Sequence, residues 1–509
     1  MVAAENGALP RGKVGGVGDV MRDLPLALAE LDWVPTVLTP AYGVFGDLPG
    51  AMQTASLEVS FGGDIHAVSV LQIPGPDERV RHVAFEHENF SPQGIGRIYC
   101  DDGDSNPFAT DATKFAFLSA VVAAYVNGVE EKPDVVHLHD WHAALYCALR
   151  HFDPALAGLR EYRTVFTIHN LAMQGIRPFD GHDSSLRAWF PDLVYDPATL
   201  VDPRYPDCVN PMAAAIRLAD GLNTVSPTYA EEILRPNDPQ HGFEGGEGLE
   251  KDLQAVAEDG RLTGILNGCN YPKRDRRRPG WRRLLDTIDA EVKVWKENNS
   301  SPGWMHDVAR ERIRSLPKRR PAHLLTSIGR MTAQKVDLFR APVRPGVAAV
   351  EAILENLGQK GAFIMLGSGD RRLEEALGGV ARDHENFLFL CGYSESFSEM
   401  LYKAGDLFLM PSVFEPCGIS QMLAMRAGQP CVVHAVGGLK DTVSHRFNGF
   451  AFGGFSTELQ ARNFVDAVQS AVDMRVRAPE RWLRIRDRAA AARFTWAASA
   501  EQYVGKLYE

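Results

Sequence analysis

Short apolar runs alternate with longer helical segments along the whole chain, and this alternation limits the possible folds more than any other feature. Runs rich in β-branched residues predict strands, and the segments between them have the spacing of helices. Strands separated by helices pair in parallel, so the pattern predicts an α/β protein with doubly wound sheets. Because 509 residues are more than one core usually supports, we expect two such units.

The expected elements are spread evenly along the chain. We expect strands in the first half at 33–39, 134–140, 163–170 and 221–226, and in the second half at 262–268, 323–330, 362–370, 386–392, 407–412 and 430–435. We expect helices at 19–31, 111–129 and 371–377. The first residues resemble the end of another strand. Thr495 can cap a closing helix, because a threonine hydroxyl accepts a backbone N–H there. The glycine-rich stretch 236–260 is the expected crossing between the units.

The composition excludes several classes of partner. A formal charge of -11 disfavours nucleic acid, although a neutral polymer such as a glucan needs no basic surface. The basic stretch 272–283 is therefore expected to be a solvated loop. The 7 scattered cysteines indicate a reducing compartment rather than a disulfide framework. Without a leader or an apolar run of about 18 residues, we expect a cytoplasmic protein with no membrane segment. The oligomeric state stays open.

Ligands of doubly wound sheets bind beyond the carboxyl ends of the strands, so residues just after a strand or just before a helix are the candidates. Lys13, Gly15 and Gly16 precede the first expected helix. Glycines let the backbone approach a ligand, and a helix N-terminus offers N–H groups to a phosphate. Such turns are also common without any ligand. The loop matches neither a Walker motif nor G-x-G-x-x-G.

Two histidine-containing motifs follow strands in the first half. The run from His137 to His142 suggests zinc, but no standard ligand spacing completes such a site. We expect structural or substrate-contacting histidines instead. Asp140 suits sugar hydroxyls, and the neighbouring tryptophan suits a sugar ring. His169, at the end of the strand 163–170, is either a ligand-binding group or a satisfied core histidine.

Two further motifs lie in the second half. Arg330 and Lys335 follow a strand and can converge on one diphosphate, although ordinary surface charge is the alternative. Glu415 also follows a strand and is succeeded by a helix start at 417–420. That arrangement places a carboxylate beside N–H donors. Cys417 is expected to be a packed residue rather than a nucleophile.

Taken in order, these motifs resemble those of bacterial glycogen synthases and plant starch synthases, a family of retaining glycosyltransferases. The likeness runs from Val2 to Tyr508 and includes H-x-H-D-W-H, T-I-H-N-L-A-x-Q-G, T-V-S-P-T-Y, G-I-L-N-G, L-G-x-G-D and P-S-x-F-E-P-C-G-x-x-Q. The resemblance implies a GT-B fold, in which two Rossmann-like domains face each other across a deep cleft. It implies an acceptor-side domain at 1–258, a nucleotide-sugar domain at 259–488, and a helix at 489–509 that packs back on the first domain.

The resemblance also implies an activity, namely transfer of glucose from ADP-glucose or UDP-glucose to the non-reducing end of an α-1,4-glucan. Configuration is retained, and no metal or other cofactor takes part. The implied catalytic residues are Asp140, His169, Arg330, Lys335 and Glu415. The implied substrate-binding residues are Lys13, Gly15, Gly16, Asp19, Asn267, Tyr393, Cys417, Gly418, Ile419 and Ser420.

Several positions depart from the family patterns and keep alternatives open. Val336 replaces a glycine, Asn270 replaces an aspartate, and the runs 245–249 and 434–436 also differ. One alternative is a related glucosyltransferase with a small acceptor, of the sucrose-synthase kind. Leu423 disfavours it, because those relatives carry a second glutamate there. The other alternative is a catalytically silent glucan-binding homologue.

Overall fold

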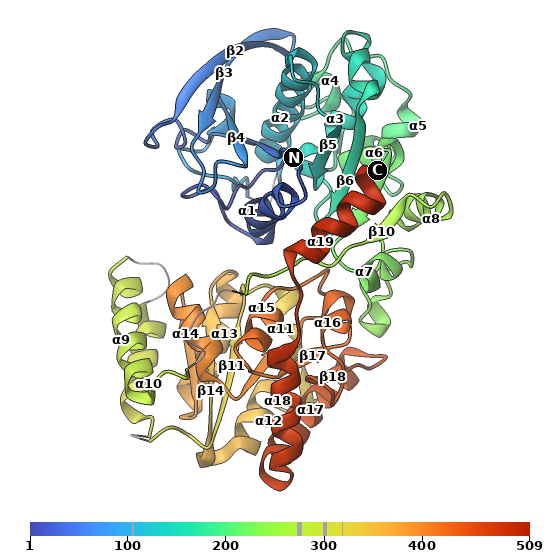
Figure 1. The fold of residues 1–509 in the computed structure, drawn as a ribbon. Coiled ribbons are helices and arrows are strands. Elements are labelled where there is room, and N and C mark those ends of the chain that lie inside the picture. Colours follow the sequence, from blue (N-terminus) through green and yellow to red (C-terminus); the bar gives the residue numbers. More distant parts are fainter. Residues whose placement is uncertain (104–105, 272–276, 299–302, 318) are drawn as a thin grey trace. The chain divides into compact units, whose positions relative to one another are not determined.

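The computed structural model describes residues 1–103, 106–271, 277–298, 303–317 and 319–509. The chain forms two compact units, each built on a largely parallel sheet with helices on both sides (Figure 1). Unit 1 comprises Met1–Asn237, Gly245–Asn270 and Thr495–Glu509, and unit 2 comprises Asp238–Glu244 and Tyr271–Phe494.

Unit 1 is a mixed sheet that is parallel through its centre. Its strands are β1 (Thr36–Pro40), β2 (Met52–Phe61), β3 (Asp64–Ile73), β4 (Arg81–Glu86), β5 (Val135–His139), β6 (Arg163–Ile168), β7 (Arg177–Pro178), β8 (Cys208–Val209), β9 (Gly221–Thr224) and β10 (Leu262–Gly264). Its helices are α1 (Gly16–Ala29), α2 (Ala109–Gly128), α3 (Trp141–Phe152), α4 (Leu186–Trp189), α5 (Pro197–Leu200), α6 (Pro211–Leu218), α7 (Pro227–Glu232), α8 (Glu250–Glu258) and α19 (Trp496–Tyr503).

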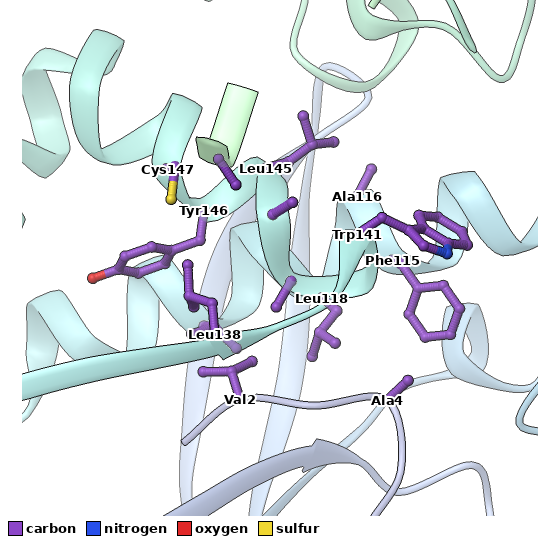
Figure 2. Packing of buried hydrophobic residues seen from close by; sticks show 14 of the residues in the cluster. Val2, Ala4, Phe115, Ala116, Leu118, Leu138, Trp141, Leu145, Tyr146 and Cys147 are labelled. Atoms are coloured by element: carbon purple, nitrogen blue, oxygen red, sulfur yellow. The ribbon is translucent and has the colours of Figure 1, made fainter. Parts of the chain in front are cut away.

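Val2 joins the two halves of this sheet, which run in the orders β2-β3-β4-β1 and β5-β6-β9-β10. It bridges Leu38 of β1 and Leu138 of β5 in parallel, so the first residues do act as a very short strand. Its neighbours pack into the core of unit 1 (Figure 2). The antiparallel hairpin of β2 and β3 was not expected, because the sequence pattern predicted only parallel pairing.

Unit 2 holds a six-stranded parallel sheet in the order β15-β14-β11-β16-β17-β18. Its strands are β11 (His323–Ile328), β12 (Pro342–Arg344), β13 (Val347–Ala348), β14 (Gly361–Gly367), β15 (Phe387–Cys391), β16 (Leu407–Met410), β17 (Cys431–His434) and β18 (Phe450–Phe452). Its helices are α9 (Trp281–Glu297), α10 (Gly303–Ser315), α11 (Ala333–Arg340), α12 (Ala349–Leu357), α13 (Arg371–Asp383), α14 (Glu395–Ala404), α15 (Ser420–Arg426), α16 (Gly437–Thr442), α17 (Thr457–Arg477) and α18 (Pro479–Ala491).

The structure moves two of the expected domain boundaries. The stretch 262–268, expected in the second domain from residue 259, forms β10, which pairs in parallel with β9 of unit 1. Unit 1 therefore continues to Asn270. The return to unit 1 begins at Thr495 rather than at residue 489, because α18 belongs to unit 2. Of the basic stretch, 272–276 lie outside the described residues, and from Trp281 it is helix α9 rather than loop.

Helix α2 is the apolar centre of unit 1. It is the only helix in the described ranges that is long and apolar enough to cross a membrane. Most of that apolar stretch, 72%, is buried inside the unit, where Phe115, Phe117 and Leu118 are fully enclosed. Its hydrophobicity is therefore accounted for by the core of a globular unit.

The C-terminal segment is part of the core of unit 1. Thr495 caps α19 as expected, since its side chain accepts a hydrogen bond from the backbone of Ala498. The segment then closes in a π turn, Val504–Tyr508. Trp496 and Tyr503 pack against the apolar face of α1, which includes Met21 and Leu24. The end of the chain thus supports the helix that follows the glycine-rich loop.

Asp406 gathers three arginines at the beginning of β16 in unit 2. Its carboxylate lies 3.0 Å from Arg278, 2.9 Å from Arg320 and 3.2 Å from Arg475, and it also accepts the backbone N–H of Leu324. The side chain is only 5% exposed. One buried carboxylate therefore ties together segments that are far apart in the sequence.

Replacing Asp406 tests how much this network contributes to the free energy of unfolding. Asp406→Asn should lower the free energy of unfolding by about 3–5 kcal/mol, because three guanidinium groups would lose their buried counter-ion. The matched control is Asp289→Asn, because Asp289 pairs with Arg310 and its side chain is 30% exposed. This substitution should lower the free energy of unfolding by less than about 1 kcal/mol. Urea unfolding would measure both. Equal losses would contradict a special role for Asp406.

Candidate active-site groups in the two units

Asp140 and His169 meet at the carboxyl edge of the sheet in unit 1. Strands β5 and β6 are parallel neighbours in which His139 is paired with Thr167, so the residues that follow them are adjacent. Oδ1 of Asp140 accepts the backbone N–H of His169 at 2.7 Å and that of Asn170 at 3.4 Å. Two of the expected catalytic residues are therefore directly connected.

The environment of Asp140 is unusual in two respects. Burial raises the pKa of its carboxyl to about 7, although the N–H groups of His169 and Asn170 act in the opposite direction. Its backbone has φ +57°, which non-glycine residues rarely adopt, and such strain is often found at functional sites. The carboxylate orients the turn that follows β6, a role that the sequence did not indicate.

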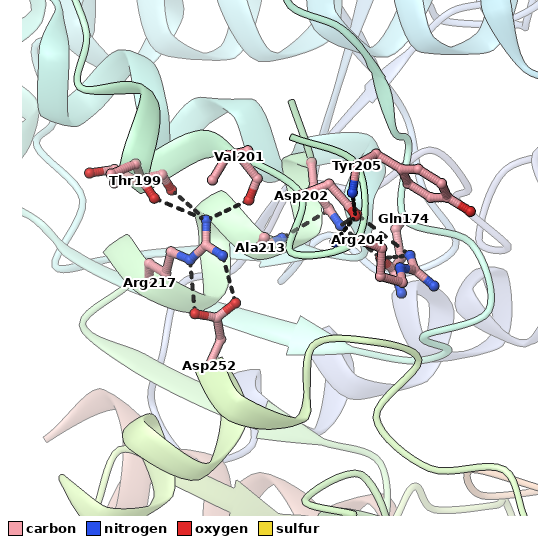
Figure 3. A network of polar contacts seen from close by, with 11 residues as sticks. Gln174, Thr199, Val201, Asp202, Arg204, Tyr205, Ala213, Arg217 and Asp252 are labelled. Carbon is pink, nitrogen blue, oxygen red and sulfur yellow. Dashed lines mark hydrogen bonds and ion pairs between the residues drawn. The ribbon is translucent and has the colours of Figure 1, made fainter. Parts of the chain in front are cut away.

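The loop after His169 is held by its own polar network. The side-chain amide of Gln174 donates to the carbonyl oxygens of Leu171 and Glu247, and its oxygen accepts from Asn210 and Arg204. Figure 3 shows this network beside the neighbouring one, in which Arg217 pairs with Asp252. Just after Gln174, the backbone passes so close to Trp141 that a Cβ on Gly175 would lie 2.3 Å from the ring. The position therefore requires glycine.

The three histidines of β5 and α3 differ in surroundings. His137 bonds the hydroxyl of Tyr508 at 2.7 Å and that of Thr167 at 2.6 Å, whereas His142 packs among aromatic rings. Nδ1 of His139 bonds Nε2 of His169 at 3.0 Å. The described ranges contain no group of three or more histidine, cysteine or acidic residues arranged to hold a metal ion. Because both ring nitrogens of His137 bond hydroxyl groups of the core, this histidine fits the structural alternative rather than the substrate-contacting one.

The glycine-rich loop of unit 1 is filled by a carboxylate from the same unit. Oε2 of Glu5 accepts the N–H groups of Val14 and Gly15 at 2.8 and 2.6 Å, and Oε1 accepts the hydroxyl of Tyr99. The N–H of Gly15, which the sequence suggested as a phosphate contact, thus bonds a carboxylate of its own unit in this structure. Sequence reasoning missed Glu5, although it follows the short strand at Val2 and the strand-end rule would have found it.

The remaining groups of this loop are partly engaged as well. Lys13 pairs with Asp19 at 2.6 Å, and Asp19 also lies 3.1 Å from Arg22. Gly16 begins α1 with open space where a side chain would be. Farther along, Asn267 follows β10 and is buried, and its Oδ1 has no hydrogen-bond partner within the described ranges. An unpaired buried acceptor is costly unless a ligand or water meets it.

In unit 2, half-buried Lys335 and buried Glu415 form an ion pair at the carboxyl edge of the sheet. Ser412 donates to the same oxygen of Glu415 at 3.0 Å. Hydrogen bonds also connect the two backbone segments here. The N–H of Val413 donates to the carbonyl oxygen of Gln334, and the side-chain amide of Gln334 donates to the carbonyl oxygen of Phe414. The structure therefore brings together two of the residues singled out in the sequence.

The other candidates in unit 2 surround this pair less closely. Arg330 follows β11 and Tyr393 follows β15, and both side chains are exposed. Cys417 is buried, and Gly437 and Gly438 pack so tightly on the backbone of 415–417 that no side chain would fit there. Gln421 donates to the carbonyls of Cys417 and Gly418, and Ile419 and Ser420 begin α15.

Buried histidines should make unit 1 sensitive to acid. Burial lowers the pKa of His142 to about 3 and that of His82 to about 4, and it also lowers the pKa values of His137 and His139 well below the usual value. Between about pH 6.5 and 4, these histidines are protonated in the unfolded chain but stay neutral in the folded unit. The free energy of unfolding therefore falls as the pH falls. Asp140 has the opposite effect. Because the pKa of its carboxyl is raised to about 7 in the folded unit, its contribution to the free energy of unfolding increases as the pH falls below about 7.

Urea unfolding at several pH values between 7 and 5 would measure this slope. Each such histidine contributes at most about 1.4 kcal/mol per pH unit. His142→Phe keeps an aromatic ring in an aromatic pocket and should flatten the slope. A wild-type stability that did not fall toward pH 5, or an unchanged slope in the variant, would contradict the assignment of neutral buried histidines.

Comparison with known proteins identifies the family. A family model described as the starch synthase catalytic domain matches residues 1–255, and one described as glycosyl transferases group 1 matches 322–473. Glycogen synthase of Anaeromyxobacter dehalogenans (strain 2CP-C) is 35% identical, over 97% of this chain and 96% of that protein. Glycogen synthase of Thioalkalivibrio sulfidiphilus is 33% identical, over 97% and 95%.

Solved structures agree with this result. The catalytic domain of starch synthase IV from Arabidopsis thaliana, bound to ADP and acarbose, superposes with a TM-score of 0.75 at 27% identity, covering 100% of this chain and 97% of that one. Sucrose-phosphate synthase from Thermosynechococcus elongatus, at 18% identity and a TM-score of 0.56 over 100% of this chain and 97% of that one, shares the fold alone. Two Rossmann-like units make this a GT-B type fold. The chain belongs to the glycogen synthase and starch synthase family of glycosyltransferases.

Proposed function

We propose that this protein transfers glucose from ADP-glucose to the non-reducing end of an α-1,4-glucan, with retention of configuration, in the cytoplasm. UDP-glucose is the second donor to test. The observation that carries the proposal furthest is the Lys335–Glu415 pair, a half-buried cation and a buried carboxylate that a family of glucan synthases would use on a sugar diphosphate. The ADP bound to the related starch synthase favours the adenosine donor.

The groups of unit 2 are proposed to bind the donor. As the bond to glucose breaks, negative charge accumulates on the departing diphosphate. Lys335 and Arg330 stabilise that charge, and their positions are set in advance by the surrounding fold. Glu415 holds Lys335 in place and accepts hydrogen bonds from glucose hydroxyls. Tyr393, with its exposed ring, stacks on the nucleotide base, and 417–420 contact the glucose and the phosphate.

The groups of unit 1 are proposed to contact the sugars. Burial lowers the pKa of His169 to about 3, so its ring is neutral in the physiological range and suits a hydroxyl rather than a phosphate. Asp140 fixes the turn that carries it. Asn267 has an unsatisfied acceptor that a sugar hydroxyl would meet. Lys13 and Gly16 are the parts of the glycine-rich loop proposed to contact the donor, with Asp19 orienting the lysine.

A donor and acceptor panel tests the activity. ADP-glucose and UDP-glucose are offered with glycogen, with maltooligosaccharides and with fructose, and nucleotide release is measured. The assay contains EDTA, since we propose that Arg330 and Lys335 rather than a metal ion meet the diphosphate charge. We expect release with a glucan acceptor and an α-configured new bond by NMR. Transfer only to fructose would favour a sucrose-type enzyme, and no release with any acceptor would favour a silent homologue.

Substitutions in unit 2 test the residues. Glu415→Gln and Lys335→Ala should each lower kcat by roughly 10²-fold or more, because an interaction that stabilises the transition state is lost. Lys293→Ala is the matched control, since this lysine is exposed and pairs with an aspartate on the same helix of unit 2. Circular dichroism would check that each variant is folded. Wild-type turnover in either Glu415→Gln or Lys335→Ala would reject the assignment.

A further inference from the structure

Three histidine rings form a continuous stack from the core of unit 1 to the end of β6. His137 and His139 lie on the same face of β5, and their ring centroids are 4.1 Å apart. The ring of His139 lies 5.3 Å from that of His169, with the planes inclined by 29°. The first two rings are buried, whereas His169 is half-buried at the strand end. If His169 contacts substrate, the rings of His139 and His137 lie behind it, on the side of the core.

The hydrogen bonds around His137 determine which of its nitrogens carries hydrogen. The hydroxyl of Thr167 donates to Oδ1 of Asn223 at 2.5 Å, so its oxygen can only accept from Nε2 of His137. Because a neutral imidazole has one N–H, Nδ1 of His137 is then an acceptor. The hydroxyl of Tyr508 donates to it. Thr167 thus sets the tautomer of His137, and Tyr508 complements it with a second hydrogen bond that holds the ring plane.

The same reasoning extends to the next pair. His139 bonds His169 through Nδ1, and its other nitrogen, Nε2, is buried without a hydrogen-bond partner in the described ranges. Orphaned buried N–H groups are rarer than under-satisfied acceptors. The hydrogen of His139 therefore belongs on Nδ1, from which it is donated to Nε2 of His169. His169 then carries its own hydrogen on Nδ1, which makes no hydrogen bond within the described ranges.

We propose that His139 is a positioning residue that holds His169 in the Nδ1–H tautomer, so that His169 presents an N–H donor to a sugar hydroxyl. The bonds of His137 to Tyr508 and Thr167 keep the first ring fixed, and this ring forms the wall against which His139 stacks. The proposal deepens the sugar-binding role of His169 and rests on the proposed function. The hydrogen bond that one ring nitrogen of a histidine makes sets which of its two nitrogens carries the hydrogen.

Nitrogen-15 NMR of the histidine-labelled wild-type protein tests the tautomers without any substitution at the site. We expect the hydrogen on Nδ1 in His139 and His169 and on Nε2 in His137. A hydrogen on Nε2 of His169 would overturn the proposal. This result is independent of activity. If the tautomers are as expected but no glucosyl transfer occurs, the proposed function fails and the positioning assignment stands.

Kinetics of two variants provide the second test. His139→Leu removes the donor and should lower kcat by about 10²-fold, as misplaced contacts do, with little change in donor KM. His139→Asn places an amide donor near the position of Nδ1 and should recover part of that loss. Equal kcat values in the two variants would overturn the proposal, because a purely structural role would not distinguish a donor from a methyl group.

The inner end of the stack, at His137, has a matched pair of variants. Tyr508→Phe removes the donor to His137 and should shift the nitrogen signals of His137 while the fold persists. Tyr146→Phe is the control, since this hydroxyl is buried in the same unit and makes no hydrogen bond in the described ranges. Unchanged His137 signals in Tyr508→Phe would overturn the role given to the chain terminus.

Discussion

Parallel strand pairing is the constraint on which both units depend. Because neighbouring strands run in the same direction, all of them end at one edge, and the residues that follow them collect there. In unit 1 the pairing of β5 with β6 sets Asp140 beside His169. In unit 2 the pairing of β11 with β16 sets Lys335 beside Glu415. The candidate groups are thus consequences of strand register rather than of local sequence.

A second feature common to both units is that the candidate groups are already engaged with internal partners. Glu5 fills the glycine-rich loop, Glu415 holds Lys335, and Asp140 holds the turn of His169. Such groups need little reorganisation when charge develops on a substrate, which is how polar sites are most effective. Burial also keeps the histidines of the core neutral. An uncharged ring in a low-dielectric core can stack and form hydrogen bonds without a counter-ion.

Much of the fold was predictable because strand and helix periodicity is local. Each of the ten expected strand segments overlaps an observed strand, and Thr495 caps the last helix. Contacts between distant segments were not predictable. The bond between His137 and Tyr508 joins residues 371 positions apart, and the pairing of β10 with β9 moved a domain boundary. The hairpin of β2 and β3 was missed because β2 is mostly exposed and neither strand has a clear apolar alternation along its length. Likewise, the bond between Gly15 and Glu5 was missed, because Glu5 was not recognised as a residue that follows a strand.

In the proposed mechanism, the residues after β11 and β16 receive the diphosphate of a sugar donor. A crystal structure with a bound nucleoside diphosphate would test it most directly. We predict phosphate oxygens within hydrogen-bonding distance of Lys335 or Arg330, at the carboxyl edge of the sheet in unit 2. Phosphates bound at the opposite edge, near the arginines around Asp406, would contradict the account.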